Sequence, residues 1–427
     1  MKNLKYLFLA SLGLMSAPML AQETYQDTKF AENSLTGTAR YVGMGGAMEA
    51  LGADISTISS NPAGLGLFRK SMASFSAGVV AQPGADTELN FDKTPFGFDG
   101  KKSVPSFDQI GFVWAATNGD SNVKLNFGFN YHKSTNFSQI LSAANYLNGA
   151  SQTKWASAKT AYAKELDEKH GKDAGDQIWN AVDANYNALM GKDEEGNQMT
   201  YDGRSFLFGQ YQKGYIGEYD FNISVGFNDR VWLGFTLGIH DVHYRSNSVY
   251  TENYVADKEA YGTAWESQRI TGTGYDAKLG IIFRPVEDSP FRIGAYVNSP
   301  VFYDLSMDGT ADLELVDKNI TDDKGNYAEA SNTNSSSLDY RLNTGISLGH
   351  TIGSNLALGA TYEYAWYNHM DNRVKDGGYY DGYWDEYYET SSSDDLMNDH
   401  TKQSLQGVST LKLGLEYKPV SMLALRL

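Results

Sequence analysis

Apolar and polar residues alternate with a period of two along most of the chain from residue 71 onward. In residues 123–132 the odd positions are Val, Leu, Phe, Phe and Tyr, and the even positions are Lys, Asn, Gly, Asn and His. Residues 219–228 and 231–239 repeat this pattern, with one apolar face and one face of polar residues or Gly. Because successive side chains of a β-strand point to opposite faces, the pattern predicts strands. Strands are expected near 71–81, 109–117, 123–133, 217–228, 231–249, 266–285, 290–298, 301–316, 336–351, 355–370 and 403–418.

The length and flanks of these runs favour a barrel in a membrane over a soluble β-sandwich, which would alternate as well. Runs of about 9–11 residues match a tilted membrane strand. Polar residues fill the face opposite the apolar one, and a tight turn at 228–230 contrasts with long connections at 135–216 and 371–402. Aromatic residues occur at strand ends, as in an interfacial girdle: Tyr131, Tyr219, Trp366 and Tyr417. The predicted fold class is all-β, a transmembrane antiparallel β-barrel, here residues 71–427.

The chain stops inside a twelfth candidate strand, which begins at Met422 and ends at Leu427. Bacterial single-chain barrels have an even number of strands. We therefore expect about 14 strands in the full-length protein, with the C-terminal strands missing from this chain. A barrel that closes at twelve with a short last strand is the alternative.

Composition fits this class and excludes others. The 427 residues contain no Cys, 13% are aromatic, and the formal net charge is −17. The mean hydropathy of −0.44 is too low for a helical membrane protein, whereas a barrel needs only alternate residues to face lipid. The absence of Cys excludes disulfides and thiolate metal sites. The acidic balance argues against nucleic acid as a partner.

The first residues predict export. Lys2 and Lys5 precede an apolar run from Tyr6 to Leu14, and Ala21 before Gln22 is a plausible cleavage point. Residues 1–21 are interpreted as a signal peptide, with a buried N-terminal helix as the alternative. The expected location is the outer membrane of a Gram-negative bacterium, with outer-membrane lipid and lipopolysaccharide as neighbours and a monomeric state.

Residues 22–70 are predicted to form a compact N-terminal hatch inside the barrel. Its central part, 43–66, is rich in small residues and turn-formers and contains no Lys or Arg. Gly43, Gly45 and Gly46 permit tight bends, and Asp54 is placed to cap a short helix. The Gly spacing also begins a dinucleotide-binding fingerprint, but neither the preceding strand nor the βαβ unit that such a site needs is present in the sequence.

The hatch carries the residues of a family resemblance. Arg40, Gly43, Gly45, Gly46 and Ala47, then Asp54 and the run Asn61, Pro62 and Ala63, resemble the hatch of the FadL/TodX-type transporters of long-chain fatty acids and hydrocarbons. The block 292–300 and Tyr303 to Leu305 resemble the mid-barrel strand pair of that family.

The resemblance implies a channel for facilitated diffusion of hydrophobic compounds. A ligand would land in an external apolar groove, enter the barrel, and leave sideways through the wall after a shift of the hatch. The family has a kink in its third strand at that exit, and Gly128 is the candidate for it here, because Gly permits bends and bulges. The hatch residues expected to take part in gating are Gly43, Gly45, Gly46, Asp54, Asn61, Pro62 and Ala63.

The long connections carry two unusual segments. Residues 155–190 predict a helical extracellular insertion, a helix pair within loop 135–216, whose second helix has one apolar face. That face consists of Ile178, Val182, Tyr186 and Leu189. It either packs on the neighbouring helix or captures a hydrophobic ligand. Residues 377–399 are rich in Tyr and acids, which favours a solvated loop over a surface that stacks on ligands.

Other chemistry finds less support in the sequence. His240 and His243 would point to opposite faces of a strand, so no metal is expected there. Acidic clusters at 193–197 and 394–399 favour solvated loops over Ca²⁺ sites. No cofactor and no enzymatic activity are predicted, since no hydrolase motif is recognisable. The alternatives that stay open are a structural or adhesive surface barrel and a membrane-embedded hydrolase.

Overall fold

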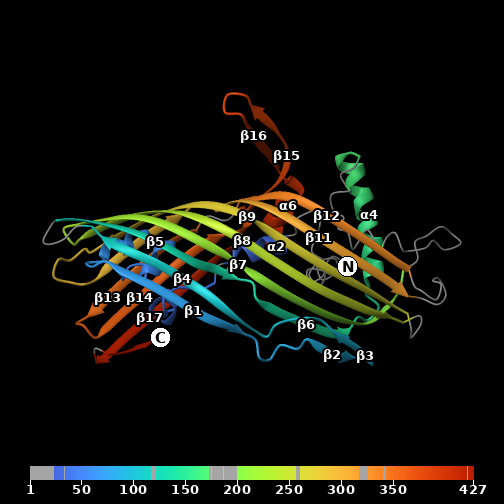
Figure 1. Ribbon diagram of the computed structural model, residues 1–427, viewed down its shortest axis with the longest axis horizontal. Helices are drawn as coiled ribbons and strands as arrows, with labels where there is room; N and C mark the ends of the chain where they lie inside the picture. The colour runs from blue at the N-terminus through green and yellow to red at the C-terminus, as the bar shows by residue number, and fades with distance from the viewer. Residues whose placement is uncertain are drawn as a thin grey trace.

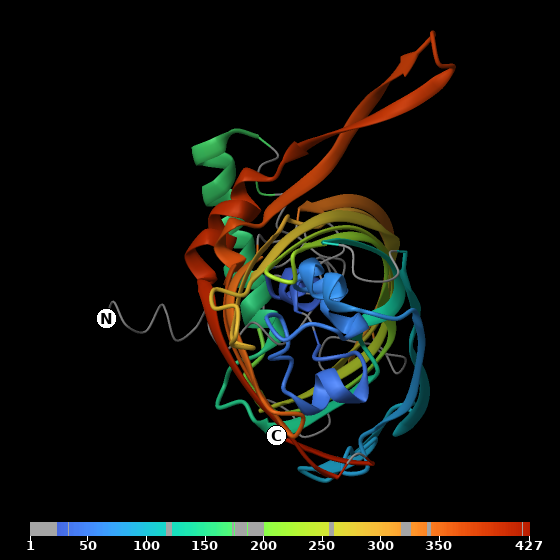
Figure 2. The ribbon, with the colours of Figure 1, turned by 90° about the vertical axis from the view of Figure 1, so that its left-hand side faces the viewer.

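The computed structural model describes residues 24–32, 34–116, 122–172, 175, 186, 200–255, 260–316, 326–339, 343–420 and 422–427. Its main feature is one antiparallel sheet of 16 strands that curls around the N-terminal segment (Figure 2). The predicted all-β barrel architecture is thereby confirmed. None of the helices in these residues is long and apolar enough to cross a membrane.

Neighbouring strands follow each other along the main path of the sheet, from β1 through β4, β5, β7, β8 and β9 to β10, β13, β14, β17 and β18. The bounds are β1 Met72–Ala81, β4 Ser103–Ala115, β5 Val123–Asn136, β7 Gly203–Phe227, β8 Val231–Tyr254, β9 Tyr261–Phe283, β10 Arg292–Asn298, β13 Asn343–Ile352, β14 Leu356–Trp366, β17 Gly407–Val420 and β18 Leu423–Arg426. Within the described residues, β1 and β18 are the two edges of this path.

Further strands extend the wall at the end opposite the N-terminal plug (Figure 1). These are β6 Gln139–Tyr146, β11 Phe302–Val316, β12 Asn326–Asp339, β15 Asp371–Asp381 and β16 Glu386–Ser393, with a separate hairpin of β2 Glu88–Phe91 and β3 Thr94–Gly97. Helix α4 Gln152–His170 lies at this end, and the two other helices of this part of the chain are η4 Tyr367–His369 and α6 Asp395–Ser404. Strands β15 and β16 form a hairpin that projects away from the barrel (Figure 1).

The N-terminal segment forms a chain of short helices inside the sheet, and we call residues 34–68 the plug. Its helices are α3 Ala39–Gly43, η1 Ile55–Ser59 and η2 Pro62–Leu67, and they follow the separate helix α2 Thr24–Ala31. They occupy the interior of the barrel in the view along its axis (Figure 2). From residue 44 onward most of the plug is buried, including Met44, Ile55, Ile58 and Leu65 at 0% exposure.

The outer face of the sheet carries a continuous apolar band. Side chains at alternate positions are about half exposed, such as Phe221 at 50%, Leu237 at 51% and Leu279 at 55%. Their strand neighbours point inward and are polar or Gly. This is the reverse of a soluble protein, where exposed contiguous apolar surface of such extent marks an interaction site.

Three expectations from the sequence need correction. Strand β7 begins at Gly203, so the region predicted as loop 135–216 contains β6, helix α4 and the first half of β7. Residues expected as a solvated loop, 377–399, form most of the β15–β16 hairpin and the start of α6. Strand β4 begins at Ser103 rather than near 109. These strand segments lie beyond the apolar band, where neither face has to be apolar and the period-two signal fades.

Candidate functional site

The inner face of β8 shows how the lumen is layered. Trp232 and Thr236 contact the plug, His240 lies in a group of charged side chains, and Val242 and Tyr244 belong to an apolar cluster. Because inward residues recur at every second position, the three layers follow one another along a single strand. Strands β7 and β9 carry the same three layers at positions paired with those of β8.

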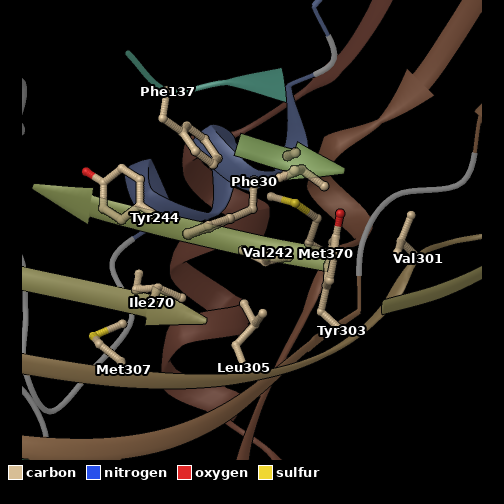
Figure 3. Close-up of a cluster of buried hydrophobic side chains, with 12 residues drawn as sticks. Phe30, Phe137, Val242, Tyr244, Ile270, Val301, Tyr303, Leu305, Met307 and Met370 are labelled. Atoms are coloured by element: carbon tan, nitrogen blue, oxygen red, sulfur yellow. The ribbon is translucent and has the colours of Figure 1, made fainter. Parts of the chain in front are cut away.

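The apolar layer is the largest hydrophobic cluster among the described residues, and we call it the lumen cluster. It joins side chains of four wall strands with the helix α2 (Figure 3). Its buried members are Phe30, Ala31, Phe137, Ile216, Val242, Tyr244, Ile270, Val301, Tyr303, Leu305, Met307 and Met370. An enclosed apolar surface with few polar groups is the chemistry of a site for a lipophilic molecule.

Phe30 of α2 fills the centre of the lumen cluster. Its ring lies edge-on to Phe137 at 5.8 Å and to Tyr244 at 5.9 Å between centroids. Phe137 and Tyr244 are themselves 5.1 Å apart at 83°, so the three rings form one edge-to-face group (Figure 3). Helix α2 therefore occupies space that an apolar ligand of the lumen would need.

Lys29 brings a charge next to this apolar surface. Its Nζ donates to the Tyr244 hydroxyl at 3.4 Å and lies 5.6 Å from the centre of the Tyr244 ring. Burial lowers the pKa of Lys29 to about 8, because the charged form loses its hydration. Holding α2 in this position therefore costs free energy near neutral pH, because Lys29 is charged and partly desolvated there.

A group of six buried ionisable side chains, the ionic layer, separates the lumen cluster from the plug. Its members are His132, Glu218, Asp220, His240, Asp276 and Lys278. Lys278 Nζ donates to Glu218, to Asp220 at 2.9 Å and to Asp276 at 3.1 Å. At Gly238 a Cβ would overlap the Asp276 carboxylate, so a Gly is needed to admit the group. The His240 ring lies edge-on to Tyr303 of the lumen cluster at 5.7 Å, which joins the two layers.

The ionic layer contains the only two sets of donors with metal-ligand spacing found in the described residues. These are His132 with Glu218 and Asp220, and Glu218 with His240 and Asp276; the donor atoms of each lie within 4.8 Å of one another. Lys278 already binds the three carboxylates, so its ammonium supplies the positive charge that a cation would bring. His240 points inward at 4% exposure and His243 points outward, as the strand period predicted.

Side chains of the wall hold the plug through its backbone carbonyls. Asn126 of β5 donates to Leu65 O at 2.7 Å and to Phe68 O at 3.0 Å. Further bonds run from Asn222 to Pro62 O at 3.4 Å, from Thr236 to Ile58 O at 3.1 Å and from Arg292 to Leu51 O at 2.7 Å. Short helices leave carbonyls unpaired, and the wall supplies the missing donors.

Glu49 is the buried acid of the plug. Its carboxylate accepts from Tyr41 at 3.2 Å and from Thr361 of β14 at 2.6 Å, and it lies 3.8 Å from Lys412 Nζ of β17. Burial raises the pKa of Glu49, and Lys412 offsets part of that rise. The acid thus ties the plug to two wall strands.

Glycines on the inner wall allow the plug to approach its backbone closely. At each of them an added Cβ would meet plug atoms, for example the Pro62 backbone at Gly234 and the Ala47 carbonyl at Gly359. The set spans eight strands: Gly111, Gly128, Gly234, Gly280, Gly294, Gly349, Gly359 and Gly414. The glycines that the alternation pattern placed on the inner face therefore form the seat of the plug.

The residues proposed from the hatch motif belong to the plug that rests on these glycines. Gly45 and Gly46 have φ of +59° and +74°, which favours Gly. Asp54 accepts from Ser56 N at 3.0 Å as the cap of η1, as predicted. Gly43 ends α3 against the Arg426 side chain.

Asn61 connects the motif both to the rest of the plug and to the wall. It is fully buried, and its Nδ2 donates to Glu49 O at 3.0 Å and to Ile281 O of β9 at 3.4 Å. Its Oδ1 accepts from Ala63 N at 3.2 Å, which caps η2 with Pro62 in the first turn. Pro62 thus begins η2, and Ala63 packs on Trp232 and Ile282.

The expected wall kink is not at Gly128. The ladders of β5 run without a break through Gly128, whose inner side meets Leu65 of the plug. The irregularity of β5 lies between Lys133 and Thr135, where the register to β7 shifts. A Gly is needed at position 128 because Leu65 of the plug lies against it. The strand pattern alone does not distinguish this reason for a Gly from a bend in the strand.

This irregularity lies beside an opening in the hydrogen-bond ladder. Strands β4 and β5 pair only from Gln109 with His132 to Ala115 with Asn126. Beyond that point β4 pairs with β1 and β5 pairs with β7. In the described residues, the gap is crossed by side chains: Ser106 Oγ accepts from Lys133 Nζ at 3.1 Å and from Asn136 Nδ2 at 3.3 Å.

The start of the plug covers this gap from the inside. Ser34 N donates to Ser134 O at 3.0 Å, Thr36 Oγ1 to Lys133 O at 2.7 Å, and Thr135 Oγ1 to Glu32 O at 2.9 Å. Helix α2 and the plug therefore meet at the irregular part of β5. Sequence reasoning missed this contact, because Ser and Thr in a linker carry no pattern that marks their partner.

Of the residues proposed for external ligand capture, only Tyr186 is described. Ile178, Val182 and Leu189 lie outside the described residues. Tyr186 is 1% exposed and packs with Ala156 of α4, with Ala264 of β9 and with Ala311 and Leu313 of β11. This residue joins the helical insertion to the wall, so it is not part of an open groove.

No protein-family model and no curated protein matches the chain. Solved structures similar to it include the toluene transporter TodX of Pseudomonas putida, at 13% identity over 93% of this chain and 83% of that one, with a TM-score of 0.43. The CymD monoaromatic hydrocarbon channel is 12% identical over 90% and 81%, with a TM-score of 0.42. A FadL homologue of Pseudomonas aeruginosa is 13% identical over 91% and 78%, with a TM-score of 0.45. These belong to the types that the hatch motif resembles.

Proposed function

We propose that the protein is an outer-membrane channel for facilitated diffusion of hydrophobic compounds, such as long-chain fatty acids or aromatic hydrocarbons. The observation that carries the proposal is the pair of apolar surfaces on the two sides of one wall. Outside, the band that includes Phe221 and Leu237 suits lipid. Inside, the lumen cluster forms a second apolar surface, which offers an apolar molecule a site when α2 moves away.

The route has an internal gate at α2. A ligand that enters the lumen cluster displaces Phe30 from its edge-to-face contacts with Phe137 and Tyr244. Below the cluster, the ionic layer and the plug oppose passage toward the other end of the barrel, because an apolar molecule would have to separate buried ion pairs. The remaining direction is sideways.

The lateral exit is the gap between β4 and β5. When α2 leaves the lumen cluster, the adjoining residues Ser34 and Thr36 release the carbonyls of Ser134 and Lys133. The ligand then reaches the outer apolar band without crossing the full lumen. This replaces Gly128 as the proposed exit.

A cross-link tests gate and exit together. The chain has no Cys, so Ser34→Cys with Ser134→Cys introduces one defined pair next to a backbone hydrogen bond. In cells that lack their own channel, uptake of radiolabelled oleate and toluene should fall to background when the pair is oxidised and recover on reduction. Either single variant is the control. Uptake that is equal in oxidised and reduced cells would overturn the lateral route, and no uptake by the wild type would overturn the channel itself.

One observation favours a second candidate, a surface adhesin. The β15–β16 hairpin projects from the barrel and exposes Tyr383 at 84% and Trp384 at 66%. Exposed aromatic side chains are enriched where proteins bind partners. A channel does not need this hairpin, whereas an adhesin does not need the plug.

A further inference from the structure

A row of cations crosses the outer face of the barrel above the apolar band. Lys213 of β7 lies directly opposite Arg245 of β8, which lies directly opposite Arg269 of β9. All three side chains point outward, and none forms an ion pair within the described part of the chain. Like charges directly opposite each other destabilise a sheet. In a chain of net charge −17, such a row of cations therefore indicates a site for an anionic partner.

The row lines one pocket of about 540 Å³ together with three further basic residues. Lys101, Lys133 and His243 complete its basic lining, and Tyr211 and Tyr215 add aromatic rings. Lys133 Nζ lies 5.1 Å from the centre of the Tyr215 ring. The pocket thus combines donors for anionic oxygens with flat apolar faces.

Acids near the pocket do not neutralise it. Asp241 accepts from His243 at 3.0 Å, and Asp308 lies opposite Arg269 in the ladder to β11 without forming an ion pair with it. Asp304, one further acid on β11, binds Lys375 at 2.9 Å. Lys213 and Arg245 keep cations as their cross-strand neighbours.

The height of the row identifies the kind of anion. The edge of the apolar band is marked by the aromatic residues Tyr219 and Tyr275, which lie in register with Ile239 between them. Lys213 is six residues beyond Tyr219 on the same strand, which is about 20 Å along the strand and about 15 Å along the axis of a tilted barrel. Phospholipid headgroups extend only about 5–8 Å beyond the hydrocarbon. An anion at this height needs a taller headgroup built of sugars, and the Tyr rings suit sugar faces.

We propose that this pocket binds the phosphate groups of a phosphorylated glycolipid of the surrounding outer leaflet. Its acyl chains lie on the apolar band below, and its phosphorylated sugars reach Lys213, Arg245 and Arg269. The proposal rests on the outer-membrane placement of the proposed function. The pocket shares Lys133 and Asn136 with the gap between β4 and β5, but the three cations of the row are not among the residues proposed for gate or exit.

The test measures binding of defined lipids to the full chain in detergent micelles. The probe is a rough-type lipopolysaccharide with a phosphorylated core, compared with the same molecule after enzymatic dephosphorylation, with phosphatidylglycerol and with inorganic phosphate. The variant is Lys213→Gln with Arg245→Gln and Arg269→Gln. A charge-matched control removes three dispersed exposed cations, Lys70→Gln with Lys164→Gln and Lys172→Gln.

We expect the row variant to bind the phosphorylated probe at least tenfold more weakly, and the control to bind it like the wild type. Dephosphorylation should weaken wild-type binding by a similar factor. Equal affinity of the wild type and the row variant would overturn the proposal. A matching loss with phosphatidylglycerol or with inorganic phosphate alone would also overturn it, by assigning the row to a general anion. If the triple variant does not fold, Arg245→Gln alone is used, with an expected loss of about threefold.

Hydrocarbon uptake by the row variant separates this proposal from the proposed function. The row lies outside the lumen, so uptake should match the wild type. A wild type that binds the glycolipid but takes up no hydrocarbon would contradict the channel and leave the pocket in place.

Discussion

Phe30 of the N-terminal helix and Tyr244 of the barrel wall lie edge-to-face, with ring centroids 5.9 Å apart and an interplanar angle of 75°. The contact joins residues more than 200 positions apart in the sequence, at the centre of the largest apolar cluster described. In the proposed gate, this is the contact that an entering ligand has to break.

Replacing Phe30→Ala should open the lumen cluster to ligand. The truncation removes the ring that a lipophile has to displace, so a fluorescent probe such as 1-aminoanthracene should bind about tenfold more tightly. The variant should also lose about 3 kcal/mol of stability, typical of a buried Phe. Fluorescence titration and thermal unfolding measure the two effects. Phe75→Ala is the control, because Phe75 is 66% exposed on the outer face; weaker probe binding by Phe30→Ala than by this control would contradict the blocking role.

The docking of α2 should depend on pH through Lys29. Its pKa is lowered from 10.5 to about 8 in the docked state, so the docked state binds fewer protons than the undocked one between these values. Docking therefore strengthens as the pH rises from about 8 to 10.5, and it carries a cost of about 3 kcal/mol below pH 8. A spin label at Ser34→Cys reports the docked fraction by electron paramagnetic resonance.

In the Lys29→Met variant the docked fraction should be high and nearly constant from pH 7 to 10. Lys70→Met, at an exposed Lys after the plug, should keep the wild-type dependence. A wild-type docked fraction that falls as the pH rises would contradict the predicted strengthening of docking.

Gly234→Ala should unseat the plug. A methyl group there overlaps the Pro62 backbone, and neither the wall nor the plug backbone can rotate away as a side chain would. Overpacking of this kind costs about 1–3 kcal/mol. We expect a lower unfolding temperature and a higher ion conductance in planar bilayers. Gly84→Ala, where a methyl meets nothing within 4 Å, should change neither.

Lys278→Met should destabilise the barrel strongly. The substitution leaves Glu218, Asp220 and Asp276 buried without their cation, which costs about 3–5 kcal/mol for a buried pair. The matched control is Lys124→Met, whose partner Asp229 is 41% exposed, and its expected cost is below about 1 kcal/mol. Urea unfolding in micelles measures both. Equal midpoints would mean that the ionic layer does not contribute to stability.

Deletion of 377–390 should leave transport intact. The segment is the outer part of the β15–β16 hairpin, and the contacts of β15 with β12 lie before it, at 371–374. Uptake of hydrocarbon and the unfolding temperature should match the wild type. Loss of uptake would give the hairpin a role in ligand capture, and loss of cell-surface adhesion with normal uptake would support the adhesin.

The sequence predicted the wall well where one face meets an apolar environment. At 219–227 and 231–239 the alternation identifies the strands, because the outer side chains are apolar and the inner ones, except Trp232, are polar or Gly. At 203–216 the same strand β7 lies beyond the apolar band and carries no clear alternation, so the sequence predicts a loop there.

The candidate site was less predictable, because its parts are brought together by register. Glu218, Asp276 and Lys278 come from β7 and β9, two strands that are separated by β8. No local pattern shows that they meet. The hatch motif includes Asn61, but its partners Glu49 O and Ile281 O follow only from the packed structure.

The central claim is that an apolar ligand binds in the lumen cluster, and a heavy-atom map tests it most directly. Crystals of the wild type and of Phe30→Ala are soaked with bromobenzene or a brominated fatty acid, and anomalous data are collected at the bromine edge. The account predicts bromine peaks between Phe137, Ile270 and Tyr244, stronger in the variant. Bromine found only on the outer apolar band, in both crystals, would contradict it.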